Sequence, residues 1–233
     1  MMKVELFDGR LVVIEPMWHK ALSTESGFCK AVVAAGLLSE QQMLRAAKRY
    51  RLGCSRQGGV IYWQIDAHER IHDGKVMYYR ADCHRDKRRN PNWVSSLLQR
   101  RYQWPDHPRA SHCLFGLHLL RSTAVVAVVE AEKSAVILSE WQPDWLWLAT
   151  GGLGEVQPEK FRPLRGHRVV LYPDTDPEGT AYRRWCEAAQ TVQQQLWWED
   201  CQPIYVSPFL EQHASLEQKQ RKIDLIDYFS RAI

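Results

Sequence analysis

The strongest constraint on the fold is an alternation of short apolar runs with helical patterns in the second half of the sequence. From residue 124 the chain reads AVVAVV, EKSAVILSEW, WLWLAT, HRVVLY, EGTAYRRWCEAAQTVQQQLWW and QPIYVS, and a last amphipathic helix follows. Strands that alternate with helices form parallel sheets, because a parallel connection must cross the sheet. We therefore expect an α/β fold over residues 122–233, with a parallel sheet flanked by helices. We expect the last helix to dock Ile223, Leu225, Ile226 and Phe229 on this sheet.

The first half of the sequence has a different organisation. Apolar runs around Asp8-Gly9 predict a hairpin, and the S-x-x-Q pattern Ser39–Gln42 predicts the start of a helix. We expect residues 1–57 to form an N-terminal appendage of a hairpin and helices. The runs VIYWQID and KVMYYRA then predict an antiparallel pair, with the turn at Asp73-Gly74. Residues 58–121 are expected to form a smaller, basic, β-rich subdomain.

Length and composition exclude several classes of protein. The chain has 233 residues, of which 45% are hydrophobic and 25% charged, and this composition excludes a disordered chain. No stretch approaches the roughly 20 apolar residues of a membrane span, and the start lacks the order of a signal peptide. We expect a cytoplasmic protein with no membrane partner. Six cysteines without a C-x-x-C pattern indicate neither a disulfide scaffold nor a zinc ribbon.

Positive charge is concentrated in residues 80–109. This segment holds eight Lys/Arg against three Asp, a net charge of +5, whereas the rest of the chain sums to −1. Cations interleaved with aromatic rings are typical of single-stranded nucleic-acid binding, because phosphates pair with the cations and bases stack on the rings. We expect DNA or RNA to contact Arg85, Lys87, Arg88, Arg89, Arg100, Arg101, Trp93 and Trp104. The alternative is a solvated loop with a basic composition.

Three carboxylates follow predicted strands. Glu130 ends AVVAVV, and Asp174 and Asp176 follow HRVVLYP. Open α/β sheets bind ligands beyond the carboxyl ends of their strands, and Mg²⁺ uses one or two carboxylates together with waters and substrate phosphates. The three acids are therefore candidate ligands of Mg²⁺ or Mn²⁺ in phosphoryl transfer. The alternative is that the D-x-D pattern is only turn chemistry.

Two further features lie near these acids. Lys133 is expected in the first turn of the helix after Glu130, where it can contact a phosphate or screen the neighbouring acids. Gly151 and Gly152 follow the second strand, where glycine permits either a tight turn or the close approach of a ligand.

The order strand, Glu130, helix, strand, ATGG, strand and Asp174-x-Asp176 resembles a TOPRIM domain, the module shared by bacterial primases, topoisomerases and some nucleases. The resemblance covers about residues 122–208. It implies that Glu130, Asp174 and Asp176 hold Mg²⁺ beside a phosphodiester. Upstream, IYWQID, KVMYY, the basic segment and CLFGLHLL resemble the amino-terminal half of a bacterial primase core. The segments VVEAEKSAVIL, LATGG and YPDTD are similar to those of TOPRIM-like proteins of Bacteroidetes mobile elements.

The sequence departs from the primase pattern at identifiable points. Ala131 stands where Gly is usual, Ser134 stands where an Asp would supply a further acid, and the primase zinc-binding segment is missing. The resemblance implies a primase-like nucleotidyltransferase in DNA replication or mobilisation, which would use nucleoside triphosphates. A TOPRIM nuclease and a catalytically silent DNA-binding replication accessory are the alternatives. A replicative helicase is a candidate partner for residues 1–57.

Overall fold

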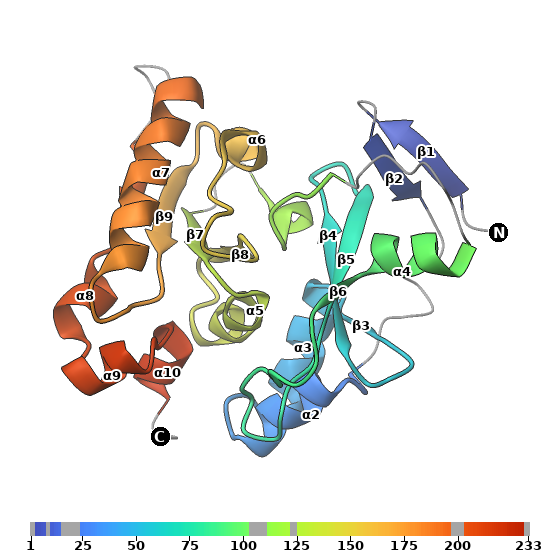
Figure 1. Ribbon diagram of the computed structural model, residues 1–233, viewed down its shortest axis with the longest axis horizontal. Helices are drawn as coiled ribbons and strands as arrows, with labels where there is room; N and C mark the ends of the chain where they lie inside the picture. The colour runs from blue at the N-terminus through green and yellow to red at the C-terminus, as the bar shows by residue number, and fades with distance from the viewer. Residues whose placement is uncertain are drawn as a thin grey trace. The chain divides into compact units, whose positions relative to one another are not determined.

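The computed structural model describes residues 3–7, 10–14, 24–102, 111–121, 125–196 and 203–230. The chain divides into two compact units, residues 1–119 and 120–233 (Figure 1). Residues 1–57, which the sequence separates from the β-rich segment that follows, lie in the same unit as that segment. None of the described helices has the length and apolar character needed to cross a membrane.

The second unit is built on a four-stranded parallel sheet. Its strands are β7 (Val125–Val129), β8 (Leu146–Ala149), β9 (Arg168–Tyr172) and β10 (Tyr205–Val206), in the order β10-β9-β7-β8. Residues 126–129 of β7 are all buried, as expected of a central strand covered on both faces. The predicted α/β fold with a parallel sheet is thus confirmed.

Helices flank this sheet. α5 (Glu132–Trp141) packs on β7 and β8, and α7 (Thr180–Leu196) packs on β10 and on the short α6 (Pro158–Phe161), which η2 (Arg162–Leu164) follows. The single last helix expected from residue 215 onward is wrong, because this stretch contains two helices, α9 (Leu216–Gln220) and α10 (Leu225–Phe229), and the short α8 (Phe209–His213) precedes them.

The break between α9 and α10 has a local cause. Lys222 adopts a left-handed conformation with φ 55, and Asp224 then caps α10 through a capping box with Asp227. Ile223, Leu225 and Ile226 are buried as expected. Phe229 is 54% exposed, so the expectation that it docks on the sheet is wrong.

The first unit contains an antiparallel sheet. Its strands are β1 (Lys3–Phe7), β2 (Arg10–Ile14), β3 (Gly53–Cys54), β4 (Val60–Ile65), β5 (Ile71–Met77) and β6 (Asn92–Trp93). They follow the order β1-β2-β5-β4-β3, and β6 also pairs with β5. The predicted hairpin β1–β2 and the predicted pair β4–β5 are both confirmed.

The turn between β4 and β5 is not where the sequence suggested. Asp73 and Gly74 lie inside β5, and Gly74 pairs with Trp63. A Cβ atom at Gly74 would lie 2.7 Å from the Trp63 ring, so glycine here makes room for an indole. The turn instead spans residues 66–70, because Asp66 Oδ1 accepts hydrogen bonds from the backbone N–H groups of His68 and Arg70.

Helices cover both faces of the antiparallel sheet. α2 (Gly27–Ala34) and α3 (Glu40–Arg49) lie on one face, and the predicted capping box that opens α3 is confirmed. Aromatic rings from these helices, from β4 and from the segment before η1 (Leu117–Leu119) contact one another on this face: Phe28, Tyr50, Tyr62 and Phe115. α4 (Val94–Tyr102) packs on the other face through Val94 and Leu98. The sequence did not predict α4, which lies inside the basic segment.

Candidate functional site

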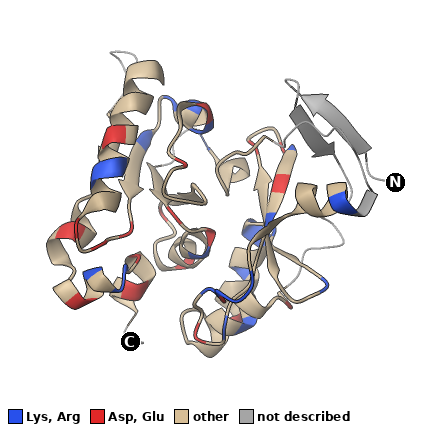
Figure 2. Cartoon of the chain, viewed as in Figure 1, with Lys and Arg blue, Asp and Glu red and all other residues tan. Residues whose placement is uncertain are grey.

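The strand order of the parallel sheet creates a switch point at the end of β7. The chain leaves β7 for β8 on one side, and β9 lies on the other side. Val129 pairs with Ala149 of β8 and with Tyr172 of β9, so the carboxyl ends of these strands lie at one edge. Figure 2 shows acidic residues just beyond the ends of β7 and β9. This edge is where open α/β sheets bind ligands.

The three predicted acids line one cavity at this edge. It has a volume of about 330 Å³, and Glu130, Asp174 and Asp176 all contribute to its wall. Two basic side chains, Arg184 of α7 and Lys222 after α9, line the same cavity. The structure thus brings together acids that are 44 residues apart in the sequence, and it adds cations that the sequence did not single out.

Asp174 lies in surroundings that oppose its ionisation. Burial, followed by the negative charges of Asp224 and Glu130, raises its pKa well above the usual range of a carboxyl group. The ammonium group of Lys133 acts in the opposite direction but does not cancel these effects. A cation that entered the cavity beside Asp174 would therefore be attracted strongly.

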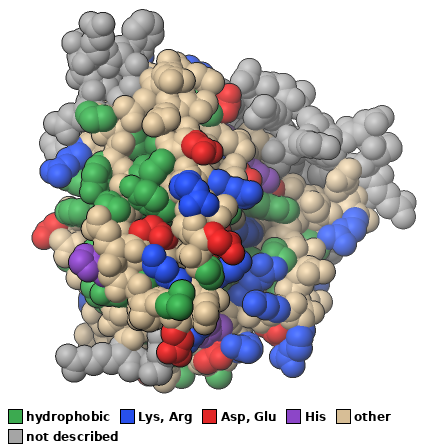
Figure 3. All heavy atoms as spheres, turned by 60° about the vertical axis from the view of Figure 1, so that its left-hand side comes forward, with side chains coloured by type: hydrophobic (Ala, Val, Ile, Leu, Met, Phe, Trp, Pro, Cys, Tyr) green, Lys and Arg blue, Asp and Glu red, His purple; other side chains and the backbone are tan. Residues whose placement is uncertain are grey.

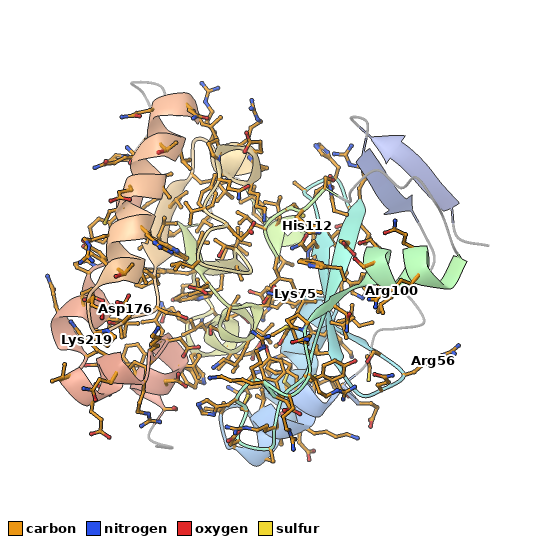
Figure 4. All side chains as sticks on the ribbon, viewed as in Figure 1. Arg56, Lys75, Arg100, His112, Asp176 and Lys219 are labelled. Carbon is orange, nitrogen blue, oxygen red and sulfur yellow. The ribbon has the colours of Figure 1, made fainter. Side chains whose placement is uncertain are left out.

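Asp176 has a different environment. Its Oδ1 accepts hydrogen bonds from the backbone N–H groups of Glu178 and Thr180, at 3.1 and 3.0 Å, and its Oδ2 accepts one from Ala181 at 2.7 Å. Burial opposes ionisation of Asp176, but these backbone hydrogen bonds hold its pKa below the usual value. Figure 4 shows Asp176 beside the first turn of α7. Both carboxylate oxygens thus accept hydrogen bonds from the backbone at the start of α7, as expected if the D-x-D pattern is turn chemistry.

Lys133 and Ser134 both contact an acid from the C-terminal helices. Lys133 Nζ lies 3.0 Å from Asp224 Oδ2 and 4.0 Å from Asp227 Oδ1. Ser134 Oγ donates a 2.7 Å hydrogen bond to Asp224 Oδ2. A carboxylate therefore lies beside the position where the resemblance expects an Asp and the sequence has Ser134. The sequence analysis did not single out Asp224, because a D-x-x-D pattern such as Asp224–Asp227 by itself indicates only the start of a helix.

The glycines after β8 form a tight turn. Gly151 has a φ of 88°, a backbone conformation that residues other than glycine rarely adopt. Its N–H donates to the carbonyl oxygen of Glu130 at 2.9 Å. Gly152 has no such requirement, because a Cβ atom there would lie 3.5 Å from Glu155 Cγ. The turn ties the end of β8 to the residue that follows β7.

The acids fit a hydrated divalent ion better than a closed metal site. Within the described ranges, no three His, Cys, Asp or Glu side chains are grouped to hold a metal ion. Mg²⁺ usually retains several waters and takes only one or two carboxylates together with substrate phosphates. Glu130 and Asp174, which line one cavity, are candidates for these two carboxylates, whereas both oxygens of Asp176 are engaged by α7.

The basic segment is exposed only in part to partners. Arg85, Lys87 and Arg88 are all exposed, and Arg88 also pairs with Asp86 at 2.9 Å. Basic and acidic side chains lie close together on the face drawn in Figure 3. Asp86 is one of the three Asp counted in the net charge of +5, so this pair shows where the negative charge of the segment lies and does not change its sum.

Arg89 and Arg100 have neutral partners. The guanidinium of Arg89 lies 3.3 Å from the centre of the Tyr78 ring and donates to Gln57 Oε1 at 2.8 Å. Arg100 donates to Asn92 Oδ1 and to the carbonyl oxygen of Ser96, at 3.1 and 3.2 Å. Because these acceptors carry no net charge, both arginines keep their positive charge at the surface.

The aromatic residues of the basic segment are less available than expected. Trp93 stacks on His112 with ring centres 4.0 Å apart, so one face of its indole is covered. Trp104 lies outside the described residues, as does the side chain of Arg101, whose backbone belongs to α4.

Residues 28–175 match the family described as a domain of unknown function, DUF6371, and this match spans well over half of the sequence. The chain belongs to the DUF6371 family. The matched residues include the basic segment, Glu130 and Asp174. No curated protein matches the sequence.

Two solved structures are similar to this DUF6371 chain. One is the primase fragment of the bacteriophage T7 primase-helicase protein, 16% identical with a TM-score of 0.46, covering 76% of this chain and 70% of that one. The other contains the bacteriophage T7 lagging-strand DNA polymerase interacting with primase domains bound to an RNA/DNA hybrid and dTTP. Its values are 16% identity, a TM-score of 0.45, and coverage of 75% and 85%. Likeness at this level carries no information about activity.

Proposed function

We propose that this protein catalyses Mg²⁺-dependent phosphoryl transfer at a phosphodiester of nucleic acid, in replication or mobilisation of a mobile element. Primase-like nucleotidyl transfer from nucleoside triphosphates is the first form of this proposal. The observation that carries it is the meeting of Glu130 and Asp174 in one cavity at the switch point of a parallel sheet. The TOPRIM resemblance of the same residues supports it independently of the cavity.

The residues of the site have separate roles in this proposal. Glu130 and Asp174 would hold Mg²⁺, or Mn²⁺ in its place, which would supply positive charge beside the reacting phosphate. Asp176 fixes the start of α7 and thereby the wall of the cavity. Arg184 and Lys222, which line the cavity, are suited to contact phosphate oxygens.

Turnover assays distinguish the possible activities. Primer synthesis and extension from nucleoside triphosphates, and nicking of circular DNA, are measured with Mg²⁺ for the wild type and for Asp174→Asn. The matched control is Glu187→Gln, which neutralises an exposed carboxylate of α7 outside the cavity. We expect loss of turnover in Asp174→Asn and wild-type turnover in the control. Nicking without synthesis would identify a TOPRIM nuclease, and equal activity in all three proteins would contradict the proposed site.

The basic segment is proposed to hold the strand, which we expect to be single-stranded DNA or RNA. Binding through phosphates releases counterions, so affinity should fall steeply with salt. Replacement of Lys87, Arg88, Arg89, Arg100 and Arg101 by Ala should flatten this dependence. A slope equal to that of the wild type would return the segment to the solvated-loop alternative.

A catalytically silent nucleic-acid-binding accessory is the second candidate. The observation that favours it is the ion pair of Lys133 with Asp224, which places a resident cation beside the acids that would hold Mg²⁺. In that case the protein binds single strands and supports a partner such as a replicative helicase. Binding of nucleic acid by the wild type without synthesis or nicking under any metal would favour this candidate.

A further inference from the structure

The first unit contains a second cavity, remote in sequence from the acids of the parallel sheet. It has a volume of about 470 Å³ and lies between α4, the neighbouring face of β4 and β5, and the turn that precedes β4. Cavities of this size are typical of small-molecule and cofactor sites.

The floor of this cavity is apolar. Ile61 and Trp63 of β4, Val76 of β5 and Leu98 of α4 are all buried and line it. These side chains form the core cluster between α4 and the sheet, so the floor is held by rigid elements. A flat ring system is the kind of group that such an apolar floor accommodates.

The rim of the cavity is polar and positively charged. Arg56 and Gln57 come from the turn before β4, and Asn92 and Arg100 come from β6 and α4. Figure 4 shows Arg56 at the turn before β4 and Arg100 on α4. No Asp or Glu occurs among the described residues that line the cavity. The rim therefore favours a ligand with negative charge.

The two side-chain amides are arranged by the arginines. Gln57 Oε1 accepts hydrogen bonds from Arg89 at 2.8 Å and from the Tyr78 hydroxyl at 3.3 Å. Asn92 Oδ1 accepts one from Arg100 at 3.1 Å. These contacts fix the planes of the two amide groups at the mouth of the cavity, and each amide oxygen accepts a hydrogen bond from an arginine. Asn92 Nδ2 already donates to the carbonyl oxygen of Asn90 at 3.4 Å, so the Gln57 amide nitrogen and the second N–H of Asn92 are the groups that can donate to a ligand.

We propose that this cavity binds a nucleotide, with the base on the apolar floor and the phosphate against Arg56 and Arg100. A phosphate alone would leave the apolar floor without a contact, and an uncharged apolar ligand would leave the two arginines without a negative partner. The nucleotide belongs either to a nucleic-acid strand or to a free nucleoside phosphate, which share this chemistry. The inference extends the proposed nucleic-acid partner of the basic segment, but it does not depend on the acid site.

The first test measures whether the base contributes to binding. In EDTA and at constant ionic strength, affinity is compared for oligothymidylate and for an abasic strand with the same number of phosphates. Thymidine monophosphate is compared with deoxyribose 5-phosphate in the same way. We expect loss of the base to weaken binding by about tenfold in at least one of the two comparisons. Base dependence in the strand alone identifies a strand site, and base dependence in the mononucleotide identifies a nucleotide site. Equal affinity with and without the base in both comparisons overturns the proposal.

The second test locates the site. The double variant Arg56→Gln/Arg100→Gln removes the charges of the rim, and Leu97→Asp introduces a carboxylate at a lining position that is 40% exposed. Both are expected to weaken binding by about tenfold, because a phosphate loses attraction or meets repulsion. The control Lys48→Gln removes one charge from an exposed position of α3, on the other face of the sheet. Wild-type affinity in both cavity variants, or equal losses in the control, overturns the proposal.

The same experiments separate this inference from the proposed function. Binding is measured without divalent metal and repeated with Asp174→Asn, whose substitution lies in the other unit. Base-dependent binding without turnover would mean that the proposed function fails while the nucleotide cavity stands. If the cavity variants keep both wild-type turnover and wild-type binding, the nucleotide cavity fails while the proposed function stands.

Discussion

Ser134 and Asp224 form a hydrogen bond across 90 residues of sequence, with the Ser134 hydroxyl donating to Asp224 Oδ2 at 2.7 Å. Lys133, the residue before Ser134, forms an ion pair with the same carboxylate oxygen. The start of α5 and the start of α10 are thus joined by a charge pair and a hydroxyl. Asp224, at the start of α10, therefore adds negative charge beside Asp174 to that of Glu130, which follows β7.

Lys133→Met is expected to destabilise the metal-free protein by about 3–5 kcal/mol, because removal of one partner of a buried ion pair leaves the other charge uncompensated. Lys133 and Asp224 are both nearly buried. Urea unfolding in EDTA measures the loss, and Mg²⁺ should restore more stability to the variant than to the wild type. Lys133→Arg, which keeps the charge, is the control. Equal unfolding of wild type and Lys133→Met would show that the ammonium does not support this cluster.

Asp174→Asn is expected to raise the melting temperature at pH 7 without metal. The pKa of Asp174 is raised in the folded protein by burial and by Asp224 and Glu130, so its ionised form destabilises the fold. The penalty is absent below the ordinary carboxyl pKa of about 4 and grows as the pH rises toward the folded pKa. Calorimetry from pH 4 to pH 8 should therefore show a gain of a few degrees that disappears at the acid end. An unchanged melting temperature at pH 7 would argue against this charge cluster.

Asp224→Asn is expected to have the opposite effect. Although burial opposes its ionisation, Lys133 and Ser134 lower the pKa of Asp224, so its charged form stabilises the fold at neutral pH. The same calorimetric series should show a lower melting temperature than that of the wild type at pH 7. When the series is extended below about pH 4, the difference should shrink, because the wild-type carboxyl group also becomes protonated there. A melting temperature raised as in Asp174→Asn would show that Lys133 does not compensate Asp224.

Asp176→Ala is expected to cost about 1–2 kcal/mol in unfolding free energy, because it removes the acceptor of three backbone N–H groups at the start of α7. Denaturant titration in EDTA measures this cost. Thr191→Ala is the control, since its hydroxyl bonds only to a carbonyl oxygen one turn earlier in the exposed part of α7. If Asp176→Ala weakens binding of Mg²⁺ as much as Asp174→Asn does and leaves stability unchanged, Asp176 is a ligand and not a cap.

Asp66→Asn is expected to destabilise the first unit by about 2–3 kcal/mol at pH 7. Burial alone would raise the pKa of Asp66, but hydrogen bonds from His72 and Arg70 hold it well below the usual value. This stabilisation is complete above about pH 4 and is lost as the pH falls below it, so the difference between wild type and variant should narrow in acid. Asp82→Asn, an exposed carboxylate paired with exposed Arg80, should change stability much less. Similar losses in both variants would contradict the buried network.

The sequence by itself determined the local elements and the acids that follow them. Apolar runs of strand length predicted β7, β8 and β9, and the pattern Ser39–Gln42 predicted the capping box of α3. Such features depend on residues within a few positions of one another, so a local pattern suffices to specify them. The position of Glu130 and Asp174 at strand ends followed directly from these runs.

Only the tertiary structure decided which distant groups meet. The order β10-β9-β7-β8 brings the end of β9 beside the end of β7, and α10 brings Asp224 to Ser134. Gly74 lies in β5 and not in a turn because the Trp63 ring on the neighbouring strand needs the space. These outcomes depend on packing and on charge pairs between segments that are far apart in the sequence, and no local pattern records which of those segments become neighbours.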